Sequence, residues 1–175
     1  YRSRVSAQKW RSSWDWALFI GSAVPPIIFG VAFGNMLQGV PFHFDETLRS
    51  TYTGSFWALL NPFALLCGVV SIVMTVFHGA SYLLLRTTGE LQARARRVGL
   101  IAGGLTALLF AIGGIWVYAG ITGYVAGNID PAGVANPLLK TVTTAEGAWF
   151  TNFMTYPALF AIPALAILAA ILGVL

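Results

Sequence analysis

Charge is what this 175-residue sequence has least of, since Asp, Glu, Lys and Arg together make up only 9% of it. A soluble domain usually carries about 25% charged residues. Hydrophobic residues make up 57% of the chain, and the mean hydropathy is +0.76. So few charges argue against a water-soluble globular domain, because water would find few polar faces to solvate. The composition indicates a protein that lies in a bilayer.

Residues that carry chemistry are equally scarce. The single cysteine, Cys67, excludes a disulfide within the chain and is interpreted as a packing residue. We find no glycine-rich phosphate loop, no cysteine pair for a metal, and no Ser, His and acid grouping at a catalytic spacing. The sequence therefore predicts no catalytic, cofactor-binding or metal-binding residues. The calculated pI of 9.6 does not indicate nucleic-acid binding, because the basic residues lie between apolar stretches.

The few charges leave four charge-free stretches, which are residues 16–44, 50–85, 98–129 and 147–175. Each is longer than the roughly 20 residues with which a helix crosses about 30 Å of hydrocarbon. The sequence therefore predicts an all-α membrane protein, a single transmembrane domain over residues 1–175. Its four helices are expected at approximately 15–38, 59–85, 98–124 and 150–175. The absence of an initiator Met, and an end inside an apolar run, favour an internal piece of a longer protein.

Basic residues are concentrated in two segments that an even number of spans separates. Eight of the ten lie in residues 2–11 and 86–97. The other two connections hold Asp45, Glu46 and Arg49, then Asp130, Lys140 and Glu146. Positive residues remain on the cytoplasmic side of a membrane. This pattern places residues 2–11 and 86–97 in the cytoplasm.

Several prolines and glycines lie within the predicted spans. Pro25 and Pro26 remove two backbone donors from the first span, which predicts either a packing kink or an opened helix that lines a cavity. Pro157 and Pro163 are interpreted in the same way in the last span, whereas Asn61-Pro62 marks the start of the second. The spacing of Gly30 with Gly34, and of Gly99 with Gly103, predicts close helix contacts; these four are the candidate packing glycines.

Two ionisable residues, His78 and Asp15, are candidates for a functional role. His78 lies inside the second predicted span, where an ionisable group suggests function. It is either an axial haem ligand or proton-relay group, or a neutral imidazole hydrogen-bonded to a neighbouring helix. Asp15 lies at the cytoplasmic mouth of the first span, where it either caps the helix, pairs with a nearby Arg or accepts protons.

Several long blocks of the sequence resemble subunit II of cytochrome bd ubiquinol oxidase. The matching blocks occur in the family's order and cover essentially the whole chain; they are Trp14-Asp15-Trp16, GSAVPPIIFGVAFGNMLQGVPF (21–42), YTGSFWALLNPFALLCGVVS (52–71), RTTGEL (86–91), GIWVYAGITGYV (114–125) and NPLLKTVTTAEGAWFTNF (136–153).

The resemblance implies a multi-pass subunit of about nine spans in the bacterial cytoplasmic (inner) membrane, of which this chain is the middle. It implies a complex that oxidises quinol and reduces dioxygen to water. The haems b and d are expected on the partner, subunit I, so no cofactor is expected on this chain and His78 matches no haem ligand. A small single-span subunit, quinol and lipid are further expected partners.

Two other functions are compatible with composition alone. A secondary transporter or channel would use the proline-containing first and fourth spans to border a substrate site, although it would lack buried charges for binding an ion. A purely structural membrane scaffold is the other alternative.

Overall fold

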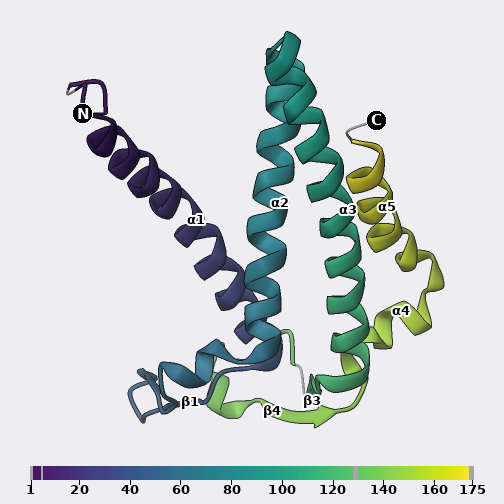
Figure 1. The fold of residues 1–175 in the computed structure, drawn as a ribbon. Helices are drawn as coiled ribbons and strands as arrows, with labels where there is room; N and C mark the ends of the chain where they lie inside the picture. Colours follow the sequence, from purple (N-terminus) through teal and green to yellow (C-terminus); the bar gives the residue numbers. More distant parts are fainter. Residues whose placement is uncertain (1, 5, 128–129, 174–175) are drawn as a thin grey trace.

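The computed structural model describes residues 2–4, 6–127 and 130–173 (Figure 1). Three long helices dominate it, α1 (Gln8–Gln38), α2 (Pro62–Arg86) and α3 (Gly89–Gly120). Each is long and apolar enough to cross a membrane, and the bent segment 148–172 is a fourth candidate span. The chain is therefore a mostly helical, multi-pass membrane protein.

Helix α1 begins seven residues before the predicted start of the first span at residue 15 and ends with it at Gln38. Of the two alternatives at Pro25 and Pro26, the structure does not show the opened helix, because the α-helix continues through both residues. Two successive prolines remove only the donors to residues 21 and 22, and the neighbouring turns keep their hydrogen bonds. The result is a continuous helix rather than a broken one.

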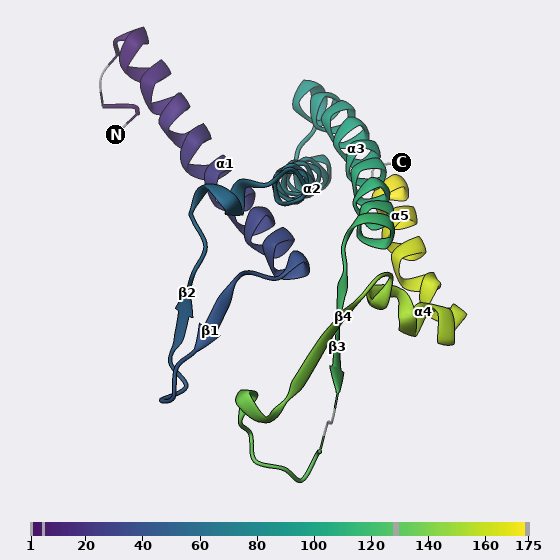
Figure 2. The ribbon, with the colours of Figure 1, turned by 90° about the horizontal axis from the view of Figure 1, so that it is seen from below.

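Helices α1 and α2 cross at small residues. Gly30 and Gly34 are buried in α1. A Cβ built on Gly34 would lie 2.7 Å from Ala64 Cα, and one built on Gly30 would lie 2.7 Å from Gly68 Cα. Backbone therefore meets backbone, which is the contact that small-xxx-small spacing permits. Beyond this crossing the N-terminal part of α1 leans away from α2 (Figures 1 and 2).

The second span begins as predicted at Asn61-Pro62. Asn61 is the N-cap, its side-chain oxygen accepts a hydrogen bond from the backbone N–H of Ala64 at 2.9 Å, and Pro62 occupies the first turn. Proline fits there because the first N–H groups of a helix have no partner within it.

The connection between α2 and α3 is much shorter than residues 86–97. It consists of Thr87 and Thr88, and Arg94, Arg96 and Arg97 lie on α3 itself. Arginine and alanine favour helix, so α3 extends beyond its apolar part to include them. Further along α3, Gly99 and Gly103 are both buried. A Cβ built on Gly103 would lie 2.6 Å from the carbonyl oxygen of Ala170, in α5 (Ala161–Leu172).

The fourth predicted span, 150–175, is not one helix. It consists of α4 (Thr151–Thr155), the 3-10 helix η4 (Pro157–Phe160) and α5, and the two halves meet at 112°. Pro157 disfavours helical backbone at the preceding Tyr156, which has φ −126° and ψ 82°. Pro163 causes no break, because it lies in the first turn of α5. Residues 174 and 175 lie outside the described residues.

Both predicted extracytoplasmic connections contain a β-hairpin. The strands are β1 (Phe42–Phe44) with β2 (Ser50–Tyr52), and β3 (Gly123–Gly127) with β4 (Thr141–Ala145). Three further 3-10 helices belong to these connections, η1 (Trp57–Leu60), η2 (Pro137–Leu139) and η3 (Ala148–Phe150). The third span is predicted to end at residue 124, but α3 ends at Gly120. The backbone adopts an extended conformation from Ile121 onward.

Asp45 fixes the turn of the first hairpin. Its Oδ1 accepts hydrogen bonds from the Thr47 hydroxyl at 2.7 Å and from the backbone N–H groups of Thr47 and Arg49 at 2.9 and 2.8 Å. These donors, the Thr47 hydroxyl first, hold the pKa of Asp45 below its usual range. The carboxylate therefore keeps the turn closed until the pH falls through that lowered pKa.

The α2–α3 turn and the two hairpins lie at opposite ends of the helices (Figure 1). Because positive residues stay inside, we expect the turn in the cytoplasm and both hairpins outside. A cysteine introduced at Glu90 should resist an impermeant thiol reagent in intact cells, and one at Asp130 should react. Labelling at position 90 with protection at position 130 would reverse this orientation.

Candidate functional site

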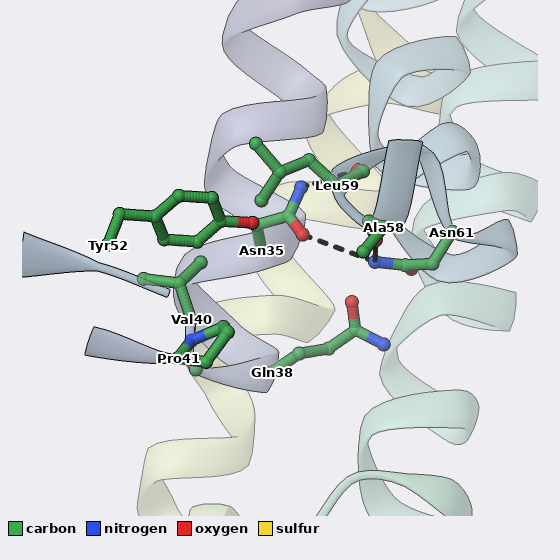
Figure 3. Close-up of a pocket in the computed structure, with 9 residues that line it drawn as sticks. Asn35, Gln38, Val40, Pro41, Tyr52, Ala58, Leu59 and Asn61 are labelled. Atoms are coloured by element: carbon green, nitrogen blue, oxygen red, sulfur yellow. Dashed lines mark hydrogen bonds between the residues drawn. The ribbon is translucent and has the colours of Figure 1, made fainter. Parts of the chain in front are cut away.

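A polar pocket lies where the hairpin end of α1 meets the start of α2 (Figure 3). Its volume is about 210 Å³, and its lining combines α1, the β1–β2 hairpin and η1. The lining residues are Asn35, Gln38, Gly39, Val40, Pro41, Tyr52, Ala58, Leu59 and Asn61. Amide groups dominate its polar lining, which suits hydrogen bonding to neutral groups or water rather than acid–base chemistry.

Asn35 is the centre of the hydrogen bonding beside this pocket. It is only 7% exposed, and its Nδ2 donates to the carbonyl oxygens of Val31 at 2.8 Å and Leu59 at 2.7 Å. Its Oδ1 accepts from Nδ2 of Asn61 at 3.2 Å, the residue that caps α2 (Figure 3). One buried amide therefore joins α1, η1 and the start of α2. Sequence analysis missed Asn35, although a lone Asn beside two packing glycines was an available signal.

Gln38 contributes the other notable group of the pocket. Its Oε1 is buried, and no donor within the described residues reaches it. The backbone oxygen of Gln38 accepts a hydrogen bond from the hydroxyl of Tyr124, in β3, at 3.0 Å. The end of α1 is thus held by the second hairpin, while the Gln38 side chain points to the pocket (Figure 3).

We expect ordered water in the pocket to donate to Gln38 Oε1, because the volume holds several molecules at about 30 Å³ each and buried acceptors are rarely left unpaired. Gln38→Met removes this acceptor at similar side-chain length. It should lower the free energy of unfolding by about 1 kcal/mol, since the water loses a partner. Thermal unfolding of the full-length protein measures this. A more stable Gln38→Met variant would mean that Oε1 is unpaired.

Asp15 pairs with an arginine, one of the three roles considered for it. Its carboxylate accepts from both Nε and Nη2 of Arg2, the latter at 3.1 Å. It does not cap the helix, because α1 begins at Gln8 with Ala7 as N-cap. Both side chains are about half exposed, 53% for Arg2 and 50% for Asp15, so the pair contributes little to stability.

His78 is exposed on α2 rather than packed between described helices. No described residue forms a hydrogen bond with it, so the neighbouring-helix partner is not among them. Met74, one turn earlier, is also exposed, at 51%. Two ligands four residues apart on one helix cannot lie on opposite sides of a haem plane. Among the described residues no three His, Cys, Asp or Glu side chains come together to hold a metal ion.

Comparison with known proteins identifies the family. A sequence model of cytochrome bd terminal oxidase subunit II matches residues 1–175. Cytochrome bd-I ubiquinol oxidase subunit 2 of Escherichia coli K12 is 51% identical over 176 residues, which is 100% of this chain and 46% of that protein. A probable cytochrome oxidase subunit 2 of Haemophilus influenzae is 51% identical over 99% of the chain, and it is covered to 46%.

A more distant relative matches a shorter part. Cytochrome bd ubiquinol oxidase subunit 2 of Bacillus subtilis is 34% identical over 98 residues, 56% of this chain and 28% of that protein. The chain thus spans about half the length of the first two relatives. Because the family match extends from the first residue to the last, the chain belongs to the cytochrome bd terminal oxidase subunit II family.

Proposed function

We propose that this chain forms part of subunit II of a terminal quinol oxidase in a bacterial cytoplasmic membrane. The observation that carries the proposal is the family match over all 175 residues, together with 51% identity to the Escherichia coli subunit. In this proposal the complex oxidises quinol and reduces dioxygen to water. The subunit completes the complex and is not catalytic alone.

The haems b and d supply the electron transfer and oxygen chemistry of the proposed complex, and we assign them to subunit I. The assignment rests on the family resemblance and on the spacing of Met74 and His78, which lie four residues apart on one helix and cannot bind opposite faces of one haem. This chain instead supplies a rigid helical body, in which α1 and α2 meet at Gly30 and Gly34 and are fastened by Asn35. We propose that this body packs against subunit I, with a small single-span subunit, quinol and lipid as further partners.

The transporter alternative has less support. A transporter would need the first helix to be broken at its prolines, but α1 is continuous through both Pro25 and Pro26. The last span is bent by 112°, but residues 147–175 contain no charged side chain that would bind an ion there. The bend therefore gives no specific reason to favour transport.

Deletion of the gene tests the proposed function. Membranes of the deletion strain should lose the quinol-dependent oxygen uptake of this oxidase and its haem d absorption band, and the full-length gene should restore both. Unchanged oxygen uptake and haem d content, in a strain that lacks other oxidases of this type, would refute the proposal.

The assignment of the haems to the partner predicts the behaviour of a His78 variant. His78→Gln should leave every haem absorption band of the assembled complex intact, because in this proposal the iron ligands belong to subunit I. Reduced-minus-oxidised spectra of the purified complex measure this. The loss of one haem band from a fully assembled variant would make this chain a direct cofactor carrier.

A further inference from the structure

The face of α2 that packs against α1 continues beyond the point where the two helices part. Ala64 and Gly68 form the packed part of this face, since Ala64 is 0% exposed and a Cβ built on Gly68 would lie 3.2 Å from Ile27 O. Steps of seven residues return to almost the same side of a helix. From Ala64 they lead to Ser71 and His78, and from Gly68 to Thr75 and Tyr82.

These four residues, Ser71, Thr75, His78 and Tyr82, are called the His78 face below. Exposure rises along it as α1 diverges (Figures 1 and 2). Ser71 is half-buried, Thr75 and His78 are exposed, and Tyr82 is 59% exposed. All four carry polar groups within a helix that is otherwise almost wholly apolar.

Only part of this polarity is satisfied within α2. The Thr75 hydroxyl donates to the Ser71 carbonyl oxygen at 2.9 Å, and the Arg86 guanidinium lies 5.9 Å from the centre of the Tyr82 ring. The His78 imidazole has no such contact among the described residues.

Lipid cannot cover His78, because hydrocarbon neither donates nor accepts hydrogen bonds. Ionisable side chains in membrane spans almost always face the bundle interior, where another helix satisfies them. The His78 face also lies on the side of α2 that faces α1, the preceding helix of the same chain. A helix that fills this place is therefore flanked by this chain on two sides.

We propose that the His78 face receives another membrane-spanning helix of the same polypeptide, from outside these 175 residues, with a hydrogen-bonding side chain opposite His78. The length of the relatives supports this, since the chain covers 46% of the Escherichia coli subunit. The place lies beside α1 and α2 of this chain, which favours helices of the same polypeptide over those of another chain. The partner group is a hydroxyl, amide or carboxyl side chain. This inference does not depend on the proposed oxidase function.

Photo-crosslinking in the full-length protein tests the identity of the occupant. The variant His78→p-benzoylphenylalanine is assembled in its native complex and irradiated, and the adduct is mapped by peptide mass spectrometry. We expect a crosslink to a peptide of the same polypeptide outside the present 175 residues. An adduct with another polypeptide, with lipid or with α1 would overturn the proposal, and so would the absence of any protein adduct. If the variant does not assemble, the same probe at Thr75 has the same expected outcome.

A pair of substitutions tests the hydrogen bond itself. His78→Gln keeps the ability to donate and accept, so the thermal midpoint should stay within about 1 °C of the unmodified protein, whereas His78→Leu should lower it by about 2 °C or more. Val76→Leu, at an exposed position on a different face of α2, is the matched control and should cause little change. Equal midpoints for the Gln and Leu variants would show that His78 has no hydrogen-bonding partner and would overturn that part of the proposal.

Discussion

Gly34→Leu should destabilise the protein by about 3 kcal/mol, the upper part of the usual range for overpacking. The reason is geometric, since even a Cβ at this position would lie 2.7 Å from Ala64 Cα, and leucine adds three more carbons there. The obstacle is backbone, which cannot rotate aside as a flexible side chain can. Helices α1 and α2 would therefore have to separate along their shared face. Thermal unfolding of the full-length protein in detergent measures the loss.

Gly21→Leu provides the matched control on the same helix. A Cβ on Gly21 would meet nothing within 4 Å, so only the gain in helix propensity remains, about 1 kcal/mol or less in favour of leucine. The control should be neutral or slightly stabilising. If both variants had the same stability as the unmodified protein, the close crossing of α1 and α2 at Gly34 would be contradicted.

Asn35→Leu should cost about 1–3 kcal/mol, because it leaves the part-buried carbonyl oxygen of Leu59 without its side-chain donor. The Nδ2 group of Asn61 also loses its bond to Asn35 but keeps its donation to the carbonyl oxygen of Ala58 at 3.4 Å. Leucine has as many side-chain heavy atoms as asparagine and a branch at the same carbon, so it approximates the shape of asparagine while removing the polar atoms. Thermal unfolding should show the loss, and a cysteine placed at Ala58 should react faster with thiol reagents as η1 loosens.

Thr106→Val is the control for Asn35→Leu. Thr106 is also buried, 8% exposed, but its hydroxyl bonds only to the carbonyl oxygen of Ala102 in the same helix. That carbonyl keeps its helical partner when the hydroxyl is removed, so the expected cost is less than about 1 kcal/mol. A loss for Asn35→Leu no larger than that for Thr106→Val would show that the buried amide does not fasten α1 to η1.

Apolar length and local signals were sufficient to predict the long helices. The first three charge-free stretches each overlap one of the long helices α1, α2 and α3. Helix forms there because backbone in hydrocarbon must satisfy its own hydrogen bonds. The start of α2 followed from Asn61-Pro62, a cap followed by a proline in the first turn. The spacing of Gly30 and Gly34 pointed to a helix contact, and the structure places both against α2.

The features that the sequence did not reveal depend on contacts between distant segments. The residues that follow Gly120 are as apolar as those of a membrane-spanning helix, yet they form β3. The partner strand, β4, follows only after a long connection. The break at Tyr156 lies in a charge-free stretch, where the following proline predicts a kink but does not specify its angle. Asn35 acquires its role through hydrogen bonds to Leu59 and Asn61, which lie 24 and 26 residues away in the sequence.

The exposure of His78 was equally unpredictable from its own sequence neighbourhood. It depends on the divergence of α1 from α2, which begins beyond the Gly30 and Gly34 crossing (Figure 1). The sequence predicts an ionisable side chain inside a membrane span but does not identify the group that forms a hydrogen bond with it. In the structure, no residue of the described helices forms a hydrogen bond with His78.

Isolation of the full-length protein from its native membrane tests the central proposal most directly. The tagged protein is purified in a mild detergent, its partners are identified by mass spectrometry, and oxygen uptake is measured with a quinol as donor. We expect it to be isolated with a haem-bearing partner, with haem b and d absorption bands and quinol-dependent oxygen uptake. A protein that is isolated alone, without haem and without oxygen uptake, while the same membranes retain an intact oxidase of this type, would contradict the account.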